Sequence, residues 1–196
     1  MKKTLIMSSL AIIAAALLIG AGTYSYFSDS ALSGGNIFTA GNIDLKVKDN
    51  DQPWGDSVSA TWTSTNMKPG DELPFSIPQV EMKNMGSLPA SSLDISASNS
   101  VPGYTGAPAD DMDKYMQITR MEYGDTIPTM DLVTYISDVN GNGWIDLDDL
   151  EQGGITGLPA PVGAGYLSMD LRFRPEAGNA FQGMTLVTSV TLTLRQ

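Results

Sequence analysis

The segment "MTLVTSVTLTLR", residues 184–195, decides the fold class of this chain. Val190, Leu192 and Leu194 alternate with Thr residues, and the whole segment is rich in β-branched side chains. One apolar face and one polar face, repeating every two residues, are typical of a half-buried strand in an antiparallel sheet. The segment therefore predicts a β-strand near the end of the chain.

Other short runs alternate in the same way and extend this prediction to the whole domain. They cover residues 43–47, 58–62, 73–77, 93–97 and 167–173. With the Gly and Pro turn signals between them, they indicate at least seven short strands in one domain. The predicted fold is all-β, a jelly-roll-like antiparallel β-sandwich. Pro74 and Pro78 restrict the 73–77 run to an edge or bulged strand, because proline cannot donate to a ladder.

Helices are expected only as short turns. After Tyr26 no window keeps an apolar stripe at helical spacing over ten residues. The segments "ADDMDKYM" (109–116) and "DLDDLEQ" (146–152) each predict one or two helical turns within loops. The segment "DLVTYIS" (131–137) contains β-branched residues and predicts a strand.

The charge and composition exclude several kinds of partner. The chain has 196 residues, with 11 Lys plus Arg, 22 Asp plus Glu, no His and no Cys. So acidic a surface would gain nothing from counterion release on nucleic acid or on an anionic membrane. The lack of Cys excludes a disulfide framework. Stability must therefore come from the core, from assembly or from a metal.

The N-terminus predicts a secretory signal peptide over residues 1–25. Lys2 and Lys3 precede the apolar run "LIMSSLAIIAAALLIGAG", and "TYS" supplies small or hydroxylated residues before Tyr26. The alternative is an uncleaved membrane anchor, since eighteen apolar residues is near the lower limit for a span. Cleavage leaves a segment at 26–41 and a domain at 42–196, so the membrane is a partner only before cleavage. The cleaved chain keeps 9 bases against 22 acids, a net charge of −13.

The segment "DVNGNGWIDLDD", residues 138–149, predicts a structural calcium site. Oxygen donors stand at the positions of an EF-hand loop, with Gly143 at the sharp turn and Asp in place of Glu at the last position. This last feature resembles the loops of dockerin modules. The alternative is that the two Asn-Gly pairs only mark hairpin turns. The predicted ligands are Asp138, Asn140, Asn142, the Trp144 carbonyl, Asp146 and Asp149.

Several motifs, in order along the chain, resemble the TasA/camelysin family of secreted biofilm-matrix fibre proteins, to which archaeal bundling pilins are similar. They are "GAGTYSYFSDSA", "FTAGNIDLKV", "KPGDELPFSI", "MKNMGSLPASSLDI" and "FQGMTLVTSVTLTL". The resemblance implies an extracellular or pilus-like filament whose subunits join head to tail by donor-strand complementation. The N-terminal segment of one subunit would fill a groove in the next. The implied donor residues are Tyr26, Phe27, Ala31, Leu32, Ile37 and Phe38.

Three alternatives stay open. The 26–40 segment can fold back on its own domain as an edge strand. The chain can be a secreted monomer that binds glycan or a surface protein through Trp54, Trp62 and other aromatics. Camelysin relatives are described as metallopeptidases, but a chain without His or Cys has no zinc-hydrolase or Ser-His signature, which predicts no enzyme. For a filament, the net charge predicts lateral bundling promoted by salt or divalent cations.

Overall fold

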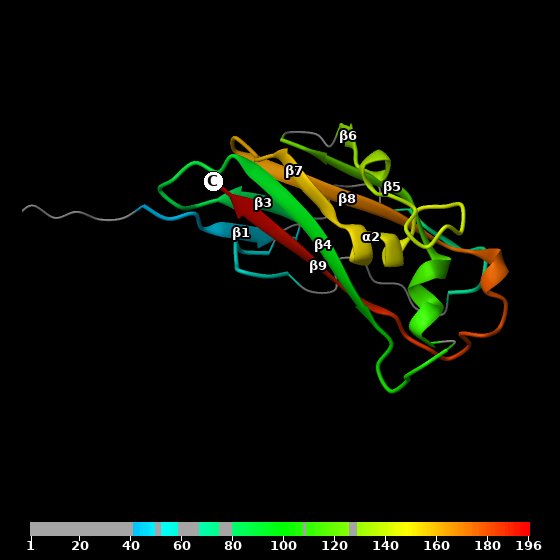
Figure 1. Cartoon of the computed structure of the whole chain (residues 1–196). Helices are drawn as coiled ribbons and strands as arrows, with labels where there is room; N and C mark the ends of the chain where they lie inside the picture. The colour runs from blue at the N-terminus through cyan, green and yellow to red at the C-terminus, as the bar shows by residue number, and fades with distance from the viewer. Residues whose placement is uncertain (1–40, 50–51, 59–66, 75–79, 108, 126–128) are drawn as a thin grey trace, which may run out of the picture. The chain divides into compact units, whose positions relative to one another are not determined.

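A computed structural model describes residues 41–49, 52–58, 67–74, 80–107, 109–125 and 129–196. The described residues form two antiparallel sheets (Figure 1). The smaller sheet has the order β7-β4-β9 and consists of β4 (Ser92–Ser100), β7 (Ile155–Pro159) and β9 (Val187–Arg195). The larger sheet has the order β1-β3-β8-β5-β6, with β2 also paired to β8. Its strands are β1 (Leu45–Lys48), β2 (Glu72–Leu73), β3 (Val80–Asn84), β5 (Met116–Gly124), β6 (Met130–Asp131) and β8 (Ala164–Phe173).

One hydrophobic core joins the two sheets. Leu93 and Ile95 on β4 and Leu167 and Met169 on β8 are all at most 1% exposed and belong to the same cluster. The alternation of these strands places every second side chain in that core. The predicted all-β sandwich is therefore confirmed.

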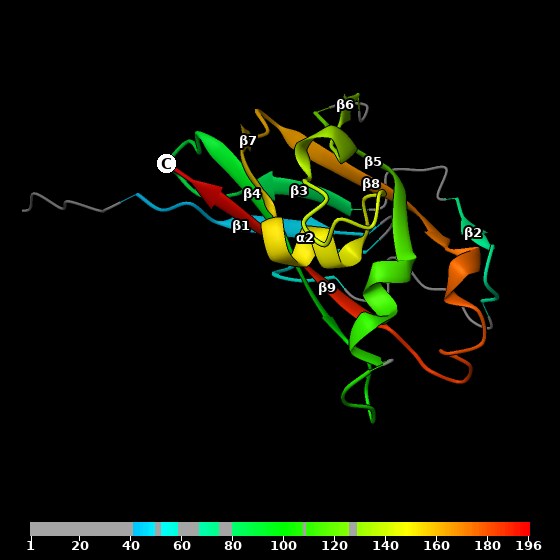
Figure 2. The same cartoon turned by 45° about the vertical axis from the view of Figure 1, so that its right-hand side comes forward.

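The helical elements are short, as predicted. They are the 3₁₀ helices η1 (Ala109–Tyr115), η2 (Val133–Tyr135) and η3 (Pro175–Ala177) and the α-helix α2 (Leu147–Gly153). Figure 2 shows α2 beside β4 and η1, and its Leu147 and Leu150 enter the core at 1% and 0% exposure.

The predicted strand at 131–137 is wrong beyond its first residue. Only Asp131 belongs to a strand, β6, and η2 follows it. The Asp131 carboxylate accepts the Val133 N–H at 3.0 Å, which satisfies the start of the turn locally. Leu132 and Ile136, four residues apart, are 0% and 5% exposed. Residues four apart lie on the same side of a helical turn, so one turn buries both side chains. A strand over the same residues would also need a partner strand for its backbone hydrogen bonds.

The turn at residues 68–71 confirms the expectation from Pro69-Gly70. Gly70 has φ +98°, and the Asp71 N–H donates to the Lys68 carbonyl at 2.9 Å. These are the features of a type II turn, which requires a positive φ at its third residue. The turn leads into β2, whose two residues pair only with β8 within the described ranges. Of the predicted strands at 58–62 and 73–77, residues 59–62 and 75–77 lie outside the described residues.

Candidate functional site

The open edge of β9 is the first feature of the candidate site. β9 pairs with β4 along its nine residues, and in the part of the chain that the structure describes no strand lies on its other side. The inward side chains of Thr188, Val190, Leu192 and Leu194 are only partly buried. A core sheet ordinarily covers such residues as completely as Leu93 on the neighbouring β4, which is 0% exposed. Among the described residues, β9 therefore has no partner on one edge and only partial cover on its inner face.

A groove of about 1520 Å³ lies against this uncovered face. Its opposite wall belongs to the larger sheet and is apolar. The residues that supply this wall are Leu45, Val47, Val80, Leu167, Met169 and Leu171. A groove of this size, with one apolar wall and a free strand edge on the other side, suits an extended peptide segment with apolar side chains.

Aromatic and methionine side chains line another part of the groove. Met112 of η1 and Met116 of β5 line it together with Phe173 and Phe181. The ring centroids of Tyr115 and Phe181 lie 5.3 Å apart, and those of Phe173 and Phe181 lie 6.2 Å apart. Methionine adapts its shape easily, whereas packed rings hold their position. This region therefore combines a fixed aromatic support with side chains that can adjust to an occupant.

The edge of the larger sheet is less open than that of β9. The Val47 N–H donates to the Gly55 carbonyl at 2.8 Å, and the Gly55 N–H donates back to Val47 at 2.9 Å. This two-bond bridge covers part of β1. Of the two edges that face the groove, β9 is the one with room for an added strand. The predicted donor residues Tyr26, Phe27, Ala31, Leu32, Ile37 and Phe38 lie outside the described residues.

The acidic loop at 138–149 is the second feature. Asp146 caps α2 by accepting the Asp149 N–H at 3.0 Å, and the Asp149 carboxylate accepts the Asp146 N–H at 3.1 Å. This reciprocal pair is a capping box, and it needs the same three-residue spacing as positions 9 and 12 of a calcium loop. The two carboxylates therefore have a structural task in starting the helix.

The backbone of the loop also surrounds the Asp138 carboxylate, at the first residue of the loop. Asp138 accepts backbone N–H groups of Gly141, Asn142 and Gly143 at 2.8–3.1 Å. Asp149 accepts the Val139 N–H at 2.8 Å, which joins the start of the loop to α2. The glycines have positive φ values where the chain turns, +71° at 141 and +92° at 143.

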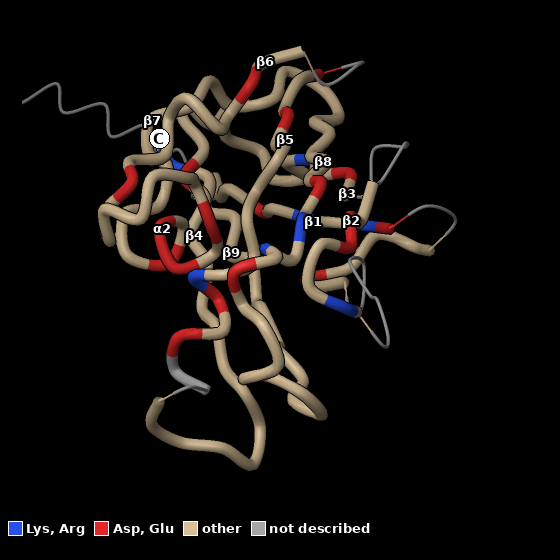
Figure 3. Tube along the Cα trace, turned by 90° about the vertical axis from the view of Figure 1, so that its right-hand side faces the viewer, with Lys and Arg blue, Asp and Glu red and all other residues tan. Residues whose placement is uncertain are grey.

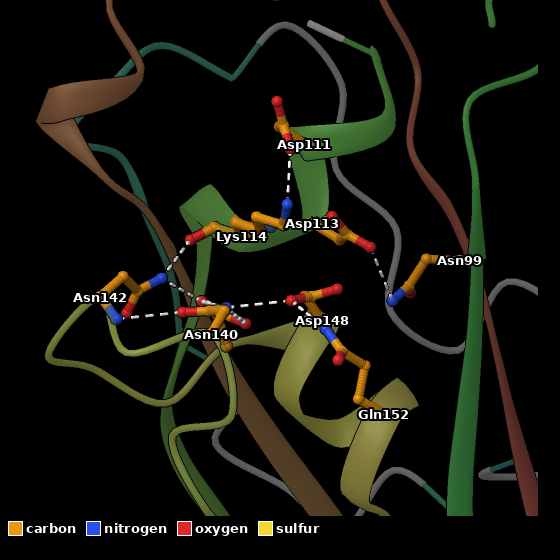
Figure 4. A network of polar contacts seen from close by, with 9 residues as sticks. Asn99, Asp111, Asp113, Lys114, Asn140, Asn142, Asp148 and Gln152 are labelled. Carbon is orange, nitrogen blue, oxygen red and sulfur yellow. Dashed lines mark hydrogen bonds and ion pairs between the residues drawn. The ribbon is translucent and has the colours of Figure 1, made fainter. Parts of the chain in front are cut away.

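Asp146, Asp148 and Asp149 form a buried carboxylate cluster, with one oxygen of each within 4.8 Å of the others. Figure 4 shows Asn140 and Asn142 beside it; Asn140 donates to Asp148 at 3.0 Å, and Asn142 to Asp146 at 2.7 Å. Burial raises the pKa of Asp146 against the effect of these amides. Hydrogen bonds to the cluster come from backbone and side-chain amides. Carboxylate oxygens are the kind of ligand that a hard divalent cation prefers, but in this cluster they accept N–H groups, so a cation would have to replace some of these hydrogen bonds.

Two of the predicted calcium ligands, Asp146 and Asp149, belong to this cluster, and the sequence interpretation missed Asp148. Asp138 is held by the loop backbone, outside the cluster. The Trp144 indole donates to the Lys114 carbonyl at 3.0 Å and lies under the Arg174 guanidinium, 4.3 Å from the ring centroid. Asp148 stands at loop position 11, which is no ligand position in an EF-hand, so only its place on α2 reveals it.

A further acidic group lies where η1 meets β4 and α2. The Asn99 amide donates to Asp113 at 3.2 Å (Figure 4). It also donates to Glu151 at 2.9 Å and so connects the three elements. Burial, followed by repulsion from Asp148, raises the pKa of Asp113 to about 6. Because η1 carries Met112 into the groove, this polar contact also positions one of the groove's walls.

Fold and groove together define a β-sandwich protein with an open strand edge. A family model described as camelysin metallo-endopeptidase matches residues 1–196. The chain therefore belongs to the camelysin family, which includes TasA, and the predicted resemblance is confirmed. At the level of the family this supports a secreted or cell-surface structural protein. No curated protein matches the chain. Among the described residues no helix has both the length and the apolar character needed to cross a bilayer.

The family description also points toward peptidase activity, which the sequence interpretation did not favour. The chain offers neither His nor Cys as a zinc ligand. The carboxylates that cluster within the described ranges are Asp146, Asp148 and Asp149, and two of these form the capping box of α2. Within the described ranges, a catalytic metal at this cluster would use carboxylates that already serve the fold.

Proposed function

We propose that the protein is the structural subunit of an extracellular filament, in which the groove beside β9 receives residues 26–41 of a neighbouring subunit. The observation that carries this proposal is the open β9 edge above a groove of about 1520 Å³. Donor and acceptor are different parts of one chain, so the contact is heterologous and repeats without closing. The product is a filament whose subunits join head to tail.

Backbone chemistry supports β9 as the acceptor. In an antiparallel pair, every second residue directs both its N–H and its C=O toward a given neighbour. A strand of nine residues therefore offers roughly eight to ten backbone groups on its free side. Each bond contributes about 0.5–1.5 kcal/mol, so the ladder is a large part of the binding free energy. The groove wall adds apolar burial for Phe27, Leu32, Ile37 and Phe38.

The test compares the chain that starts at Tyr26 with a chain that starts at Asn42. We expect filaments from the first and monomers from the second by negative-stain electron microscopy and gel filtration. A peptide of residues 26–41 should bind the shorter chain and stop the longer one from polymerising. Filaments from the shorter chain would exclude donation by the N-terminus. Monomers from both chains would favour a segment that folds back on its own domain, or a monomeric binding module.

Peptidase activity is the second candidate, since the family description names it. The measurement is hydrolysis of casein by the chain starting at Tyr26, with Zn²⁺ or Ca²⁺ added and with a chelator. Activity that the metal supports and that Asp148→Asn removes would establish the enzyme. We expect no hydrolysis, because the chain has no His or Cys to hold a zinc ion with an open position.

Calcium bound at Asp146, Asp148 and Asp149 is part of the proposal, with a structural task. The cation would relieve repulsion among three buried carboxylates and stiffen the 138–149 loop. We expect Ca²⁺ to raise the melting temperature of the chain and Asp148→Asn to abolish the rise. The same substitution leaves the capping box of Asp146 and Asp149 in place, so the fold remains. An equal rise in both proteins would exclude this site.

Lateral bundling of filaments also belongs to the proposal. Figure 3 shows acidic residues along much of the described chain, with fewer basic ones. Neighbouring filaments therefore repel at low ionic strength, and screening lets them approach.

A further inference from the structure

The outer face of the smaller sheet is unlike the rest of this acidic molecule. On β4, Ser96, Ser98 and Ser100 point away from the core and are exposed. On β9, Ser189, Thr191 and Thr193 do the same. We call these six residues the hydroxyl face. The backbone register places Ser96 opposite Thr191 and Ser98 opposite Ser189, so the hydroxyl groups form paired rows.

The fold leaves these hydroxyl groups available. Within the described ranges none of the six side chains has a hydrogen-bond partner in the chain, whereas the inward Thr188 donates to Asn99 at 2.8 Å. The charged residues of these two strands are Asp94 and Arg195, which lie at the same end of the outer face and form an ion pair. In Figure 3 the traces of β4 and β9 are accordingly tan, the colour of uncharged residues, over most of their length.

We propose that the hydroxyl face is the surface through which one filament contacts the same face of a neighbouring filament. This inference rests on the proposed function. Any contact that includes the acidic surface of a subunit with 22 Asp plus Glu brings like charges together. Two hydroxyl faces bring together uncharged donors and acceptors. The short side chains also let the sheets approach closely, as in stacked polar sheets.

The size of the face explains why polymerisation must come first. A strand of nine residues is about 30 Å long, and two or three strands are about 10–14 Å wide. The resulting area is roughly 300–400 Å² per subunit, less than half of the ~800 Å² per partner in a stable complex. A single subunit therefore does not dimerise through this face. A filament repeats the contact along its length, and the repeated weak contacts hold two filaments together.

A donor strand beside β9 does not compete with this contact. The donor enters at the free edge and the inner face of β9, where Ser189 and Thr191 also border the groove, whereas Ser96, Ser98 and Ser100 of the hydroxyl face lie on β4, away from the groove. An added strand extends the smaller sheet and widens the flat surface. Assembly and bundling thus use different faces of one strand, and substitutions on β4 separate them.

The test uses Ser96→Glu with Ser98→Glu on the central strand β4, away from the groove. Thr105→Glu with Ser137→Glu in exposed loops gives the same change in charge as a matched control. We expect filaments from wild type, variant and control, with side-by-side bundles in wild type and control and at least a ten-fold loss of bundled filaments in the variant. Bundles in the variant equal to those of the control would overturn the inference.

A chemical cross-link gives a second, independent measurement. The chain has no Cys, so Ser96→Cys introduces a unique thiol on the hydroxyl face. A short bis-maleimide should give covalent dimers in bundled filaments and none in the monomeric chain that starts at Asn42. Thr105→Cys serves as the control without dimers. Equal cross-linking of the two thiols would exclude contact between two such faces. Wild-type filaments that form bundles only when dextran is added as a crowding agent would exclude it as well. If the wild-type chain formed no filaments, the proposed function itself would be wrong.

Discussion

At the residue scale, single side chains decide whether the groove can take a strand. Val190 and Leu192 point inward from β9, stay partly exposed and meet the apolar wall formed by the larger sheet. An occupant would complete their burial, which explains why partly exposed apolar side chains persist here. Their neighbours along β9, Ser189 and Thr191, point to the outer face of the sheet and are polar because that face contacts solvent.

Val190→Asp should abolish filament formation while the monomer stays folded. In the open groove the carboxylate remains hydrated, but an inserted strand would bury it without a partner, which costs several kcal/mol. We expect at least a ten-fold loss of polymer by light scattering, with an unchanged circular dichroism spectrum. Thr105→Asp, in an exposed loop away from both the groove and the hydroxyl face, is the control and should polymerise normally. Polymer yields that match in the two variants would show that the groove is not the acceptor.

Asp113 makes the domain less stable as the pH rises. Its pKa is raised to about 6, above the ordinary value of 3.8, because of burial and the neighbouring Asp148. The folded state therefore binds more protons than the unfolded state between about pH 4 and pH 6, and the free energy of unfolding falls across that window. At about 1.4 kcal/mol for each pKa unit, the cost at pH 7 is roughly 2–3 kcal/mol.

Asp113→Asn should remove this loss. Denaturant unfolding at pH 4.5 and pH 7 is the measurement, and the difference between wild type and variant isolates Asp113 from the other carboxylates. We expect the variant to gain stability at pH 7 relative to wild type and to gain little at pH 4.5. The same difference at both pH values would contradict the raised pKa.

At the scale of elements, close backbone approach connects the strands. A Cβ on Gly86 would lie 2.1 Å from the Asn42 carbonyl oxygen, too close for any side chain. This contact ties the chain entering β1 to the turn after β3, where the Leu88 N–H donates to the Asn42 carbonyl at 3.0 Å. It therefore holds the start of β1, whose Leu45 lines the groove.

Gly86→Ala should destabilise the domain by about 2 kcal/mol or more, since the backbone itself must move. Gly163→Ala is the matched control, because nothing lies within 4 Å of a Cβ built there. Thermal unfolding of the chain that starts at Asn42 measures both effects without assembly. A melting temperature lowered equally in the two variants would mean that glycine flexibility in general, and not this contact, explains the loss.

At the scale of the whole molecule, net charge opposes association while the free sheet edge favours it. Without residues 1–25, the predicted signal peptide, the chain carries −13, and repulsion between such subunits acts over about 30 Å at 10 mM salt but only about 8 Å at 150 mM. The strand ladder within a filament is short-ranged and depends little on salt. The two levels of assembly should therefore respond differently to ionic strength.

Filaments should form at both salt concentrations, but bundles only at the higher one. Electron microscopy at 10 mM and 150 mM NaCl, with filament length and bundle width measured separately, checks this expectation. Millimolar Ca²⁺ at low salt should also promote bundling through the acidic surface. Bundle widths that stay constant across all these conditions would contradict an electrostatic barrier between filaments.

The fold class and much of the local structure could be predicted from the order of the amino acids alone. Strict alternation identified β4, β8 and β9, and the acidic segments at 109–116 and 146–152 identified η1 and α2. Alternation failed at β5, where a register shift between Ile118 and Arg120 changes which parity is buried. It also misassigned 131–137, where Leu132 and Ile136 meet the core through a single turn.

The unpaired edge of β9 beside the groove could not be predicted from the sequence. The alternation of β9 resembles that of any half-buried strand, because a period of two records the two faces of a strand and not its two edges. Whether an edge is paired depends on contacts between residues far apart in the chain, such as Val190 with Ala97. The open edge of β9, its groove and the addition of Asp148 to the carboxylate cluster are all of this kind.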